Sequence, residues 1–181
     1  MGVTIFNCEQ NGSEWLQLRC GMPTASMFSA ILAKGQGKTR KSYMNRLATE
    51  IITGEPLESF SNSSTDRGHM MEPEARSLYS FMTNYDIQQV GFIRNGQKGC
   101  SPDSLLGNSG ILEIKTQRGD LLIETLIKDE FPSEHMAQCQ GELWITERDW
   151  LEIAIYWPKM PMFVKRIGRN EMFIAELSRE V

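Results

Sequence analysis

Residues 99–117 combine acidic and basic side chains in a spacing that could hydrolyse a phosphodiester. Glu113 and Lys115 lie two positions apart in an apolar stretch, and alternate side chains of an extended strand share one face. Asp103 precedes a Gly-Asn-Ser-Gly turn, so a hairpin would bring its carboxylate back beside Glu113. We therefore predict that two carboxylates and one ammonium group converge at the end of a small sheet.

A divalent metal ion would complete this set of groups. Mg²⁺ takes oxygen ligands and typically keeps several waters beside one or two carboxylates. The ion polarises a phosphoryl oxygen and activates water, while a lysine orients that water or stabilises the pentavalent phosphorane. The alternative is a surface strand with an ordinary Glu-x-Lys pair. The preceding Ser101-Pro102-Asp103 favours the catalytic interpretation, because Pro102 fixes the backbone beside the ligand.

Two further polar residues could reach the same centre. Glu72 lies near the start of a predicted helix at residues 68–82, where the helix dipole alone would also favour an acid. Gln138 lies in a later predicted helix at residues 134–145, where it could be a plain surface position. We predict that Glu72 adds a carboxylate to the metal centre and that Gln138 approaches it.

A phosphate pocket is predicted nearer the N-terminus. Arg19 offers a planar, permanently charged fork suited to phosphate. Thr24, a predicted helix cap, and Ser26 begin the next helix, where free backbone N–H groups favour an anion. The alternative is a surface arginine beside an ordinary cap.

A basic stretch contrasts with the acidic average of the chain, whose net charge is −4 and whose pI is about 5.3. Acidity as such argues weakly against a nucleic-acid partner. Residues 34–46, however, contain no acidic side chain, and we predict that they contact DNA; the alternative is a solvated helix face. The basic residues of this stretch are Lys34, Lys38, Arg40, Lys41 and Arg46.

Composition excludes several other classes of protein. The four cysteines are Cys8, Cys20, Cys100 and Cys139. They form no close pair, which argues against a disulfide framework and against zinc or iron–sulfur sites. No apolar run is long enough to span a bilayer, and the N-terminal residues lack the basic flank and long apolar stretch of a secretory signal, so we expect a cytoplasmic protein with no membrane partner.

The apolar periodicity predicts helices before and after a hairpin-rich sheet. The expected helices cover residues 14–19, 24–32, 42–53, 68–82, 134–145 and 171–180. The expected strands cover residues 87–93, the end of a strand at 99–101, and residues 111–116, 150–157 and 163–167. Residues 58–66 are predicted to form a loop, and Pro73 should delay or bend the helix that follows, on which Met82 should face inward. A mixed linker is expected between the strand at residues 111–116 and the helix at residues 134–145. The fold class is α/β or α+β, with a small mixed sheet flanked by helices.

The order of these residues resembles the lambda exonuclease or YqaJ-like viral recombinase family within the PD-(D/E)xK nucleases. The resemblance runs from about Trp15 to Trp157. Its pieces are Trp15-x3-Arg19-x-Gly21, Thr24-Ala25-Ser26, Gly68-x3-Glu72 with Ala75-Arg76, Ser101-Pro102-Asp103, Glu113-x-Lys115, Met136-Ala137-Gln138-x-Gln140 and Trp144-x-Thr146. Ser104 departs from the glycine that is usual after the Ser-Pro-Asp.

The resemblance implies a single exonuclease domain over residues 1–181 with a restriction-endonuclease-like core. It implies a 5′-to-3′ exonuclease that uses Mg²⁺, or Mn²⁺ in its place, and leaves 3′ overhangs on linear double-stranded DNA. It further implies a homotrimeric ring that threads DNA, and a single-strand annealing protein as partner in phage recombination in the bacterial cytoplasm.

The resemblance also assigns roles to residues. Asp103 and Glu113 match the metal ligands, to which Ile114 adds its backbone carbonyl, and Lys115 matches the catalytic lysine. The helix carboxylate and the nearby glutamine of the family correspond to Glu72 and Gln138, and the arginine and serine at the 5′ phosphate correspond to Arg19 and Ser26.

Two alternatives stay open. A restriction-type endonuclease on the same core would cut closed circular DNA, which an exonuclease cannot enter. A non-catalytic DNA-end binding module would show no metal-dependent cleavage.

Overall fold

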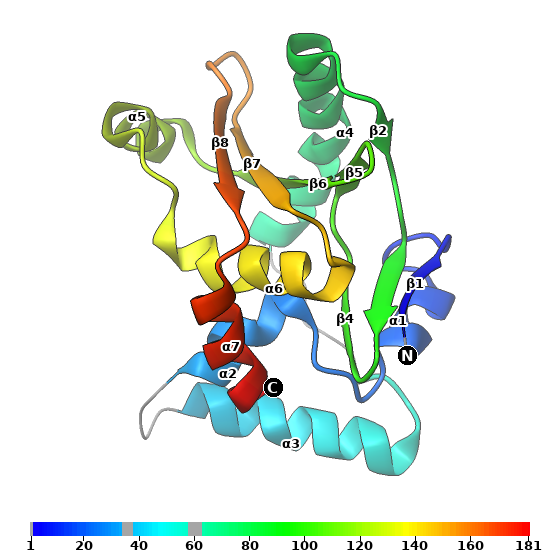
Figure 1. Ribbon diagram of the computed structural model, residues 1–181. Helices are drawn as coiled ribbons and strands as arrows, with labels where there is room; N and C mark the ends of the chain where they lie inside the picture. Colours follow the sequence, from blue (N-terminus) through cyan, green and yellow to red (C-terminus); the bar gives the residue numbers. More distant parts are fainter. Residues whose placement is uncertain (1, 34–37, 58–62) are drawn as a thin grey trace.

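A computed structural model describes residues 2–33, 38–57 and 63–181, of which residues 63–66 are described by their helical backbone alone. Its centre is a five-stranded sheet in the order β2-β5-β6-β7-β8 (Figure 1). Only β6 and β7 pair in parallel, and the other neighbours are antiparallel. The strands are β2 Ile87–Gln88, β5 Ser104–Leu106, β6 Gly110–Thr116, β7 Trp150–Tyr156 and β8 Phe163–Gly168. The predicted mixed sheet is confirmed.

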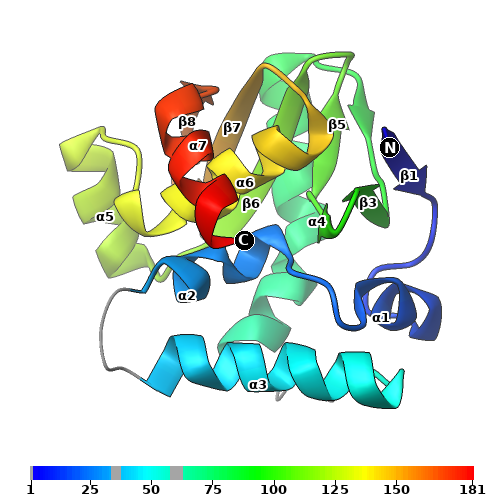
Figure 2. The ribbon, with the colours of Figure 1, turned by 60° about the horizontal axis from the view of Figure 1, so that its bottom comes forward.

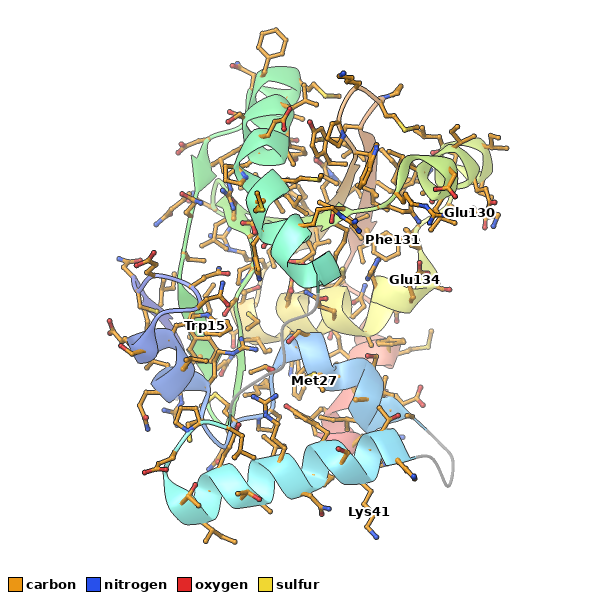
Figure 3. All side chains as sticks on the ribbon, turned by 180° about the vertical axis from the view of Figure 1, so that it is seen from behind. Trp15, Met27, Lys41, Glu130, Phe131 and Glu134 are labelled. Atoms are coloured by element: carbon orange, nitrogen blue, oxygen red, sulfur yellow. The ribbon has the colours of Figure 1, made fainter. Side chains whose placement is uncertain are left out.

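Helices cover both faces of this sheet. Helix α6 (Met136–Thr146) lies on one face and helix α4 (Ser63–Thr83) on the other, as Figures 1 and 3 show from opposite sides. Ile111 of β6 packs in the apolar cluster that includes residues of α6, whereas Leu112 packs in the cluster that includes residues of α4. Because successive strand residues alternate between faces, β6 directs the side chains of its odd-numbered residues toward α6.

A second sheet has three strands in the order β1-β3-β4, namely β1 Val3–Phe6, β3 Phe92–Asn95 and β4 Lys98–Cys100. The sequence predicted neither β1 nor the break inside residues 87–93, which divide between the two sheets. Gly91 marks that break. A Cβ atom there would lie 2.1 Å from the carbonyl oxygen of Cys8, so the two backbones meet too closely for a side chain.

The remaining helices surround the sheets. They are α1 Ser13–Arg19, the 3₁₀ turn η1 Ala25–Met27, α2 Phe28–Leu32, α3 Lys38–Thr53, α5 Gly119–Lys128, the 3₁₀ turn η2 Ser133–His135 and α7 Glu171–Glu180. Figure 2 shows α3 running across one end of the molecule beside α2. Helix α3 begins four residues earlier than predicted and ends as expected before Gly54, whose φ is +70°.

Helix α4 corrects three predictions. It begins at Ser63, so the predicted loop is wrong over residues 63–66, while residues 58–62 lie outside the described ranges. It continues through Pro73 instead of starting late, because the fully buried Ala75 and Tyr79 fix it against the sheet. Met82 was expected to face inward, but it is exposed at the end of the helix, beyond the edge of the sheet.

Helix α5 was expected to be a linker. Within this helix only Leu122 is fully buried, whereas Leu121, Ile123 and Ile127 stay exposed. Within the described ranges, no helix is both long enough and apolar enough to cross a membrane.

Candidate active site

The β5–β6 hairpin brings the predicted acids together. Ser104 pairs with Leu112 at the end of the antiparallel β5–β6 ladder, so Asp103 and Glu113 come directly beyond this pair on the two neighbouring strands. The Oδ2 atom of Asp103 accepts a 2.5 Å hydrogen bond from the backbone N–H of Ile114. This bond holds the Asp103 carboxylate against the backbone of β6, so the hairpin places Asp103 beside Glu113 as predicted.

The turn of the hairpin is held from outside. Gly107 adopts a φ of +51°, which glycine does without steric cost. The guanidinium of Arg148 donates to the carbonyl oxygens of Gly107 and Gly110 at 2.9 and 2.7 Å. Arg148 therefore fixes the register that places Asp103, although no motif in the sequence marks Arg148.

A hydrogen-bond network joins β6 to α6. The Lys115 ammonium donates to Glu113 Oε1 at 2.7 Å and to Gln138 Oε1 at 3.2 Å. The Gln138 amide nitrogen donates to Glu113 Oε1 at 2.6 Å and to Glu142 Oε1 at 2.9 Å. Glu113, Lys115 and Gln138 thus meet as the sequence predicted. Glu142 is a further member, and its only sequence signal is its position one helical turn after Gln138.

Burial shifts the pKa values of the ionisable groups in this cluster. Burial and the nearby carboxylates of Glu113 and Glu72 raise the pKa of Asp103 well above its ordinary value. Burial and Glu113 likewise raise the pKa of Glu142. Burial disfavours the Lys115 ammonium, but Glu113 and Asp103 outweigh it and raise the pKa of Lys115, so this side chain stays a cation.

The donors at the centre fit a hard divalent ion with water ligands. Glu113 is 3% exposed, and its Oε2 atom is buried without a hydrogen-bond partner. A buried carboxylate oxygen without a partner costs free energy, which a bound cation would recover. Across the described ranges, no three His, Cys, Asp or Glu side chains are arranged to hold a metal. The carboxylates of Asp103 and Glu113 and the backbone carbonyl of Ile114, with water molecules as further ligands, would be a ligand set that Mg²⁺ accepts.

Glu72 reaches the centre from α4. It shares with Asp103 the lining of a cavity of about 590 Å³. Its carboxylate pairs with the Arg76 guanidinium one turn later on the same helix. Arg76 also donates to Ser104 Oγ at 3.1 Å and to the Asp103 carbonyl at 3.3 Å. Arg76 therefore connects Glu72 to the hairpin, a role that the sequence analysis did not assign.

Arg19 lies where an anion could bind. Its guanidinium stacks on the Trp15 ring at 4.0 Å and donates to the hydroxyls of Ser101 at 3.2 Å and Thr24 at 3.4 Å. Burial lowers the pKa of Arg19 to about 10. None of the described carboxylates forms an ion pair with this buried cation, which lines a cavity of about 180 Å³ with Thr24 and Ser26.

Two details of this pocket differ from expectation. Thr24 occupies the N-cap position, as predicted, but its side chain makes no cap hydrogen bond with the described residues. Its hydroxyl instead accepts from Arg19 and lies 3.4 Å from Ser26 Oγ. Ser101 was not predicted as a contact of Arg19. It accepts from both Arg19 and the Trp15 indole at 2.8 Å, which leaves its own hydroxyl hydrogen available.

The basic stretch lies on α3, except Lys34, which is outside the described residues. Lys38 and Lys41 are exposed, and Figure 3 shows Lys41 pointing away from the body of the protein. Arg40 pairs with Glu180 at 2.9 Å, and Arg46 pairs at 2.9 Å with Glu50 beside the Arg19 pocket. The stretch therefore separates into two exposed lysines and two paired arginines.

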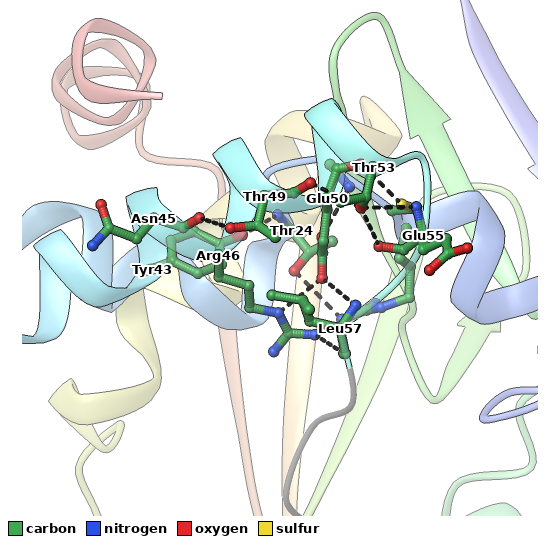
Figure 4. A network of polar contacts seen from close by, with 12 residues as sticks. Thr24, Tyr43, Asn45, Arg46, Thr49, Glu50, Thr53, Glu55 and Leu57 are labelled. Carbon is green, nitrogen blue, oxygen red and sulfur yellow. Dashed lines mark hydrogen bonds and ion pairs between the residues drawn. The ribbon is translucent and has the colours of Figure 1, made fainter.

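Glu50 ties the Arg19 pocket together. Its carboxylate accepts from the backbone N–H groups of Gly21 at 2.9 Å and Leu57 at 3.2 Å, besides Arg46 (Figure 4). Burial alone would raise the pKa of Glu50, but these hydrogen bonds outweigh it and leave that pKa lowered. No sequence pattern marks Glu50, because a glutamate that will be buried on a polar helix cannot be told from an exposed one.

Solved structures share this fold. LHK-Exo, an alkaline exonuclease from Laribacter hongkongensis, is 30% identical, with a TM-score of 0.84 over 93% of this chain and 88% of that chain. Its complex with dAMP gives 32% identity and a TM-score of 0.85 over the same shares. A phage related exonuclease from Haemophilus somnus 129PT has the same fold at 15% identity, with a TM-score of 0.66 over 88% and 89%. The fold is thus the nuclease-like mixed α/β fold of these exonucleases.

The family follows from the sequence profile. The YqaJ-like viral recombinase domain matches residues 14–149, and the chain belongs to this family, as predicted. No curated protein matches the chain.

Proposed function

We propose that this protein is a metal-dependent exonuclease that degrades one strand of linear double-stranded DNA from the 5′ end. The observation that carries the proposal is the cluster of Asp103, Glu113 and Lys115 at the β5–β6 hairpin, in which Glu113 is buried. Membership of the YqaJ-like viral recombinase family and the 32% identity to LHK-Exo support the proposal. The 3′ overhangs that remain would be substrates for strand annealing in recombination.

The residues of the cluster have distinct parts in this reaction. Asp103 and Glu113, with the Ile114 carbonyl, would hold Mg²⁺ or Mn²⁺, and Glu72 would add a carboxylate from α4. When bound, the ion supplies charge neutralisation and an activated water. Lys115 is held by Glu113 and Gln138 as a cation, so its ammonium can stabilise the negative charge that develops on the phosphoryl oxygens.

Arg19 is proposed to bind the 5′ phosphate. It is a buried cation whose described hydrogen-bond partners are neutral hydroxyls, so a phosphate would supply the opposite charge. Ser26 and Ser101 lie beside it as hydroxyl donors. That LHK-Exo binds dAMP supports a mononucleotide product.

We also propose a homotrimeric ring that threads DNA and works with a single-strand annealing protein. Support comes from the exposed apolar side chains of α5, since clustered apolar surface often marks a protein interface. Light scattering should give a mass of three times 20.6 kDa. A mass equal to one chain at working concentration would contradict the ring.

The test of the activity uses linear and closed circular duplex DNA with Mg²⁺ or with a chelator. We expect linear DNA to lose one strand from the 5′ end and the circle to stay intact. Lys115→Met should abolish cutting while DNA binding persists, and Lys128→Met on α5 is the matched control. Cutting of the circle would indicate an endonuclease, and full activity of Lys115→Met would contradict the site. Binding without any metal-dependent cleavage would leave a DNA-end binding module.

A further inference from the structure

Glu142 is a buried acid that the proposed chemistry leaves without a role. It lies on α6, one turn after Gln138, and is 1% exposed. Its Oε1 atom accepts from the Gln138 amide nitrogen at 2.9 Å, and its Oε2 atom has no hydrogen-bond partner among the residues that the structure describes. An unpartnered buried carboxylate oxygen costs free energy, so stability alone does not explain an acid here.

The Gln138 carboxamide has only one favourable orientation in this network. Its nitrogen carries two hydrogens and bonds two carboxylate oxygens, one on Glu113 and one on Glu142. Its oxygen is therefore left to face the Lys115 ammonium, 3.2 Å away. A flipped carboxamide would set its oxygen against two carboxylate oxygens and its hydrogens against a cation. Glu142 supplies half of the contacts that forbid the flip.

We propose that Glu142 is a positioning residue, which acts through Gln138 to hold the Lys115 ammonium beside Glu113. This proposal rests on the proposed function, because it concerns the cation that acts in that reaction. This role needs a hydrogen-bond acceptor for the Gln138 amide and does not need a negative charge on Glu142, because a protonated carboxyl group keeps its carbonyl oxygen as an acceptor. A glutamine should therefore replace Glu142, whereas an apolar side chain of the same length should not.

The kinetic test compares Glu142→Met with Glu142→Gln on linear duplex. For Glu142→Met we expect kcat to fall about 10- to 100-fold with KM unchanged, the usual range for residues that orient catalytic groups. Glu142→Gln should keep most of the activity. Equal losses in the two variants, or full activity of Glu142→Met, would overturn the proposal.

Protein stability separates positioning from a merely structural role. Replacing a buried acid that has one unpartnered carboxylate oxygen by an apolar residue should leave the melting temperature unchanged or higher. Gln140→Met is the matched control on the same helix, because the Gln140 amide bonds Gly168 and Asn170 away from the site. This control should melt earlier and keep its kcat.

A double-mutant cycle tests whether Glu142 acts through Gln138. If it does, adding Glu142→Met to Gln138→Leu should cost no further activity, because the link is already broken. Losses that multiply would mean an independent role and would contradict the proposal.

A measurement without DNA keeps the two proposals distinguishable. In the wild-type protein, NMR should show both side-chain amide protons of Gln138 protected from exchange with solvent. Glu142→Met should remove the protection of one of them. Wild-type protein that shows this pattern but cuts no DNA would contradict the proposed function alone. Unprotected amide protons in the wild-type protein would overturn the role of Glu142, whether or not the variants fold.

Discussion

At the residue scale, the two candidate cations, Lys115 and Arg19, differ in whether an acidic side chain neutralises their charge. Lys115 is surrounded by buried acids, which raise its pKa and keep it charged. Arg19 is the opposite case, a buried cation held by an indole ring and two hydroxyls. A cation that is buried without a described acidic partner is prepared for an anionic ligand, and the 5′ phosphate of DNA is the ligand that the proposed function offers.

The Arg19→Lys variant tests the proposal that Arg19 binds the 5′ phosphate. A lysine keeps the charge but cannot donate as a planar fork while stacking on Trp15. We expect kcat/KM on 5′-phosphorylated ends to fall at least about 10-fold, as for the loss of a charged hydrogen bond, with little change on 5′-hydroxyl ends. Arg94→Lys, an exposed arginine on β3, should leave both rates unchanged. An equal loss on both kinds of end would argue against phosphate recognition.

At the element scale, one buried acid fastens α3 to the segments around the Arg19 pocket. Glu50 joins the left-handed turn at Gly21, the α3 side chain of Arg46 and the backbone of Leu57. These segments are distant in sequence, and backbone N–H groups buried there would cost free energy without an acceptor. The pocket therefore depends on a residue that has no chemical part in the reaction.

Glu50→Gln should lower the free energy of unfolding by about 2 kcal/mol near pH 7, since it weakens hydrogen bonds to a charged group. The folded protein lowers the pKa of Glu50 below its usual value of 4.5, so the ionised form favours folding. This contribution is complete above the unfolded pKa and disappears as pH falls through the folded pKa. Urea unfolding at pH 7 and at about pH 4 should show the difference between variant and wild type shrinking. Glu55→Gln, in the exposed loop, is the control, and a difference that does not change with pH would contradict the role of the charge.

At the scale of the whole molecule, charge is unevenly distributed. The chain carries a net charge of −4, yet Lys38 and Lys41 stand exposed on α3, at the end of the molecule that Figure 2 brings forward. Local positive charge attracts phosphate even when the average is acidic. We therefore keep the prediction that this part of α3 contacts the DNA backbone.

The double variant Lys38→Gln/Lys41→Gln should weaken DNA binding equally for all sequences. Each lost phosphate contact lowers the slope of log affinity against log salt by about 1, so the slope should fall by up to about 2. Lys128→Gln/Lys159→Gln, which removes two exposed lysines elsewhere, is the control. If the slope of log affinity against log salt is the same for this double variant as for the wild type, α3 does not contact the DNA backbone.

The sequence by itself determined the family, the mixed sheet and the meeting of Asp103, Glu113 and Lys115. The physical reason is that these features are local: strand alternation and a hairpin turn place the three groups within fifteen residues. Helix α7 and strand β8 were likewise predicted close to their observed bounds, since their apolar periods and their flanking turns agree.

Only the tertiary structure decided what surrounds these groups. Ser101 and Glu50 lie in positions that no periodicity marks, and their roles come from partners distant in the chain. Glu142 lies one helical turn after Gln138, but its role depends on Glu113 and Lys115, which β6 brings to the same amide. The same holds for the break at Gly91, where the approach of another backbone ends the strand. Burial and long-range contacts set the hydrogen bonds and pKa values, and these exist only once the elements have packed.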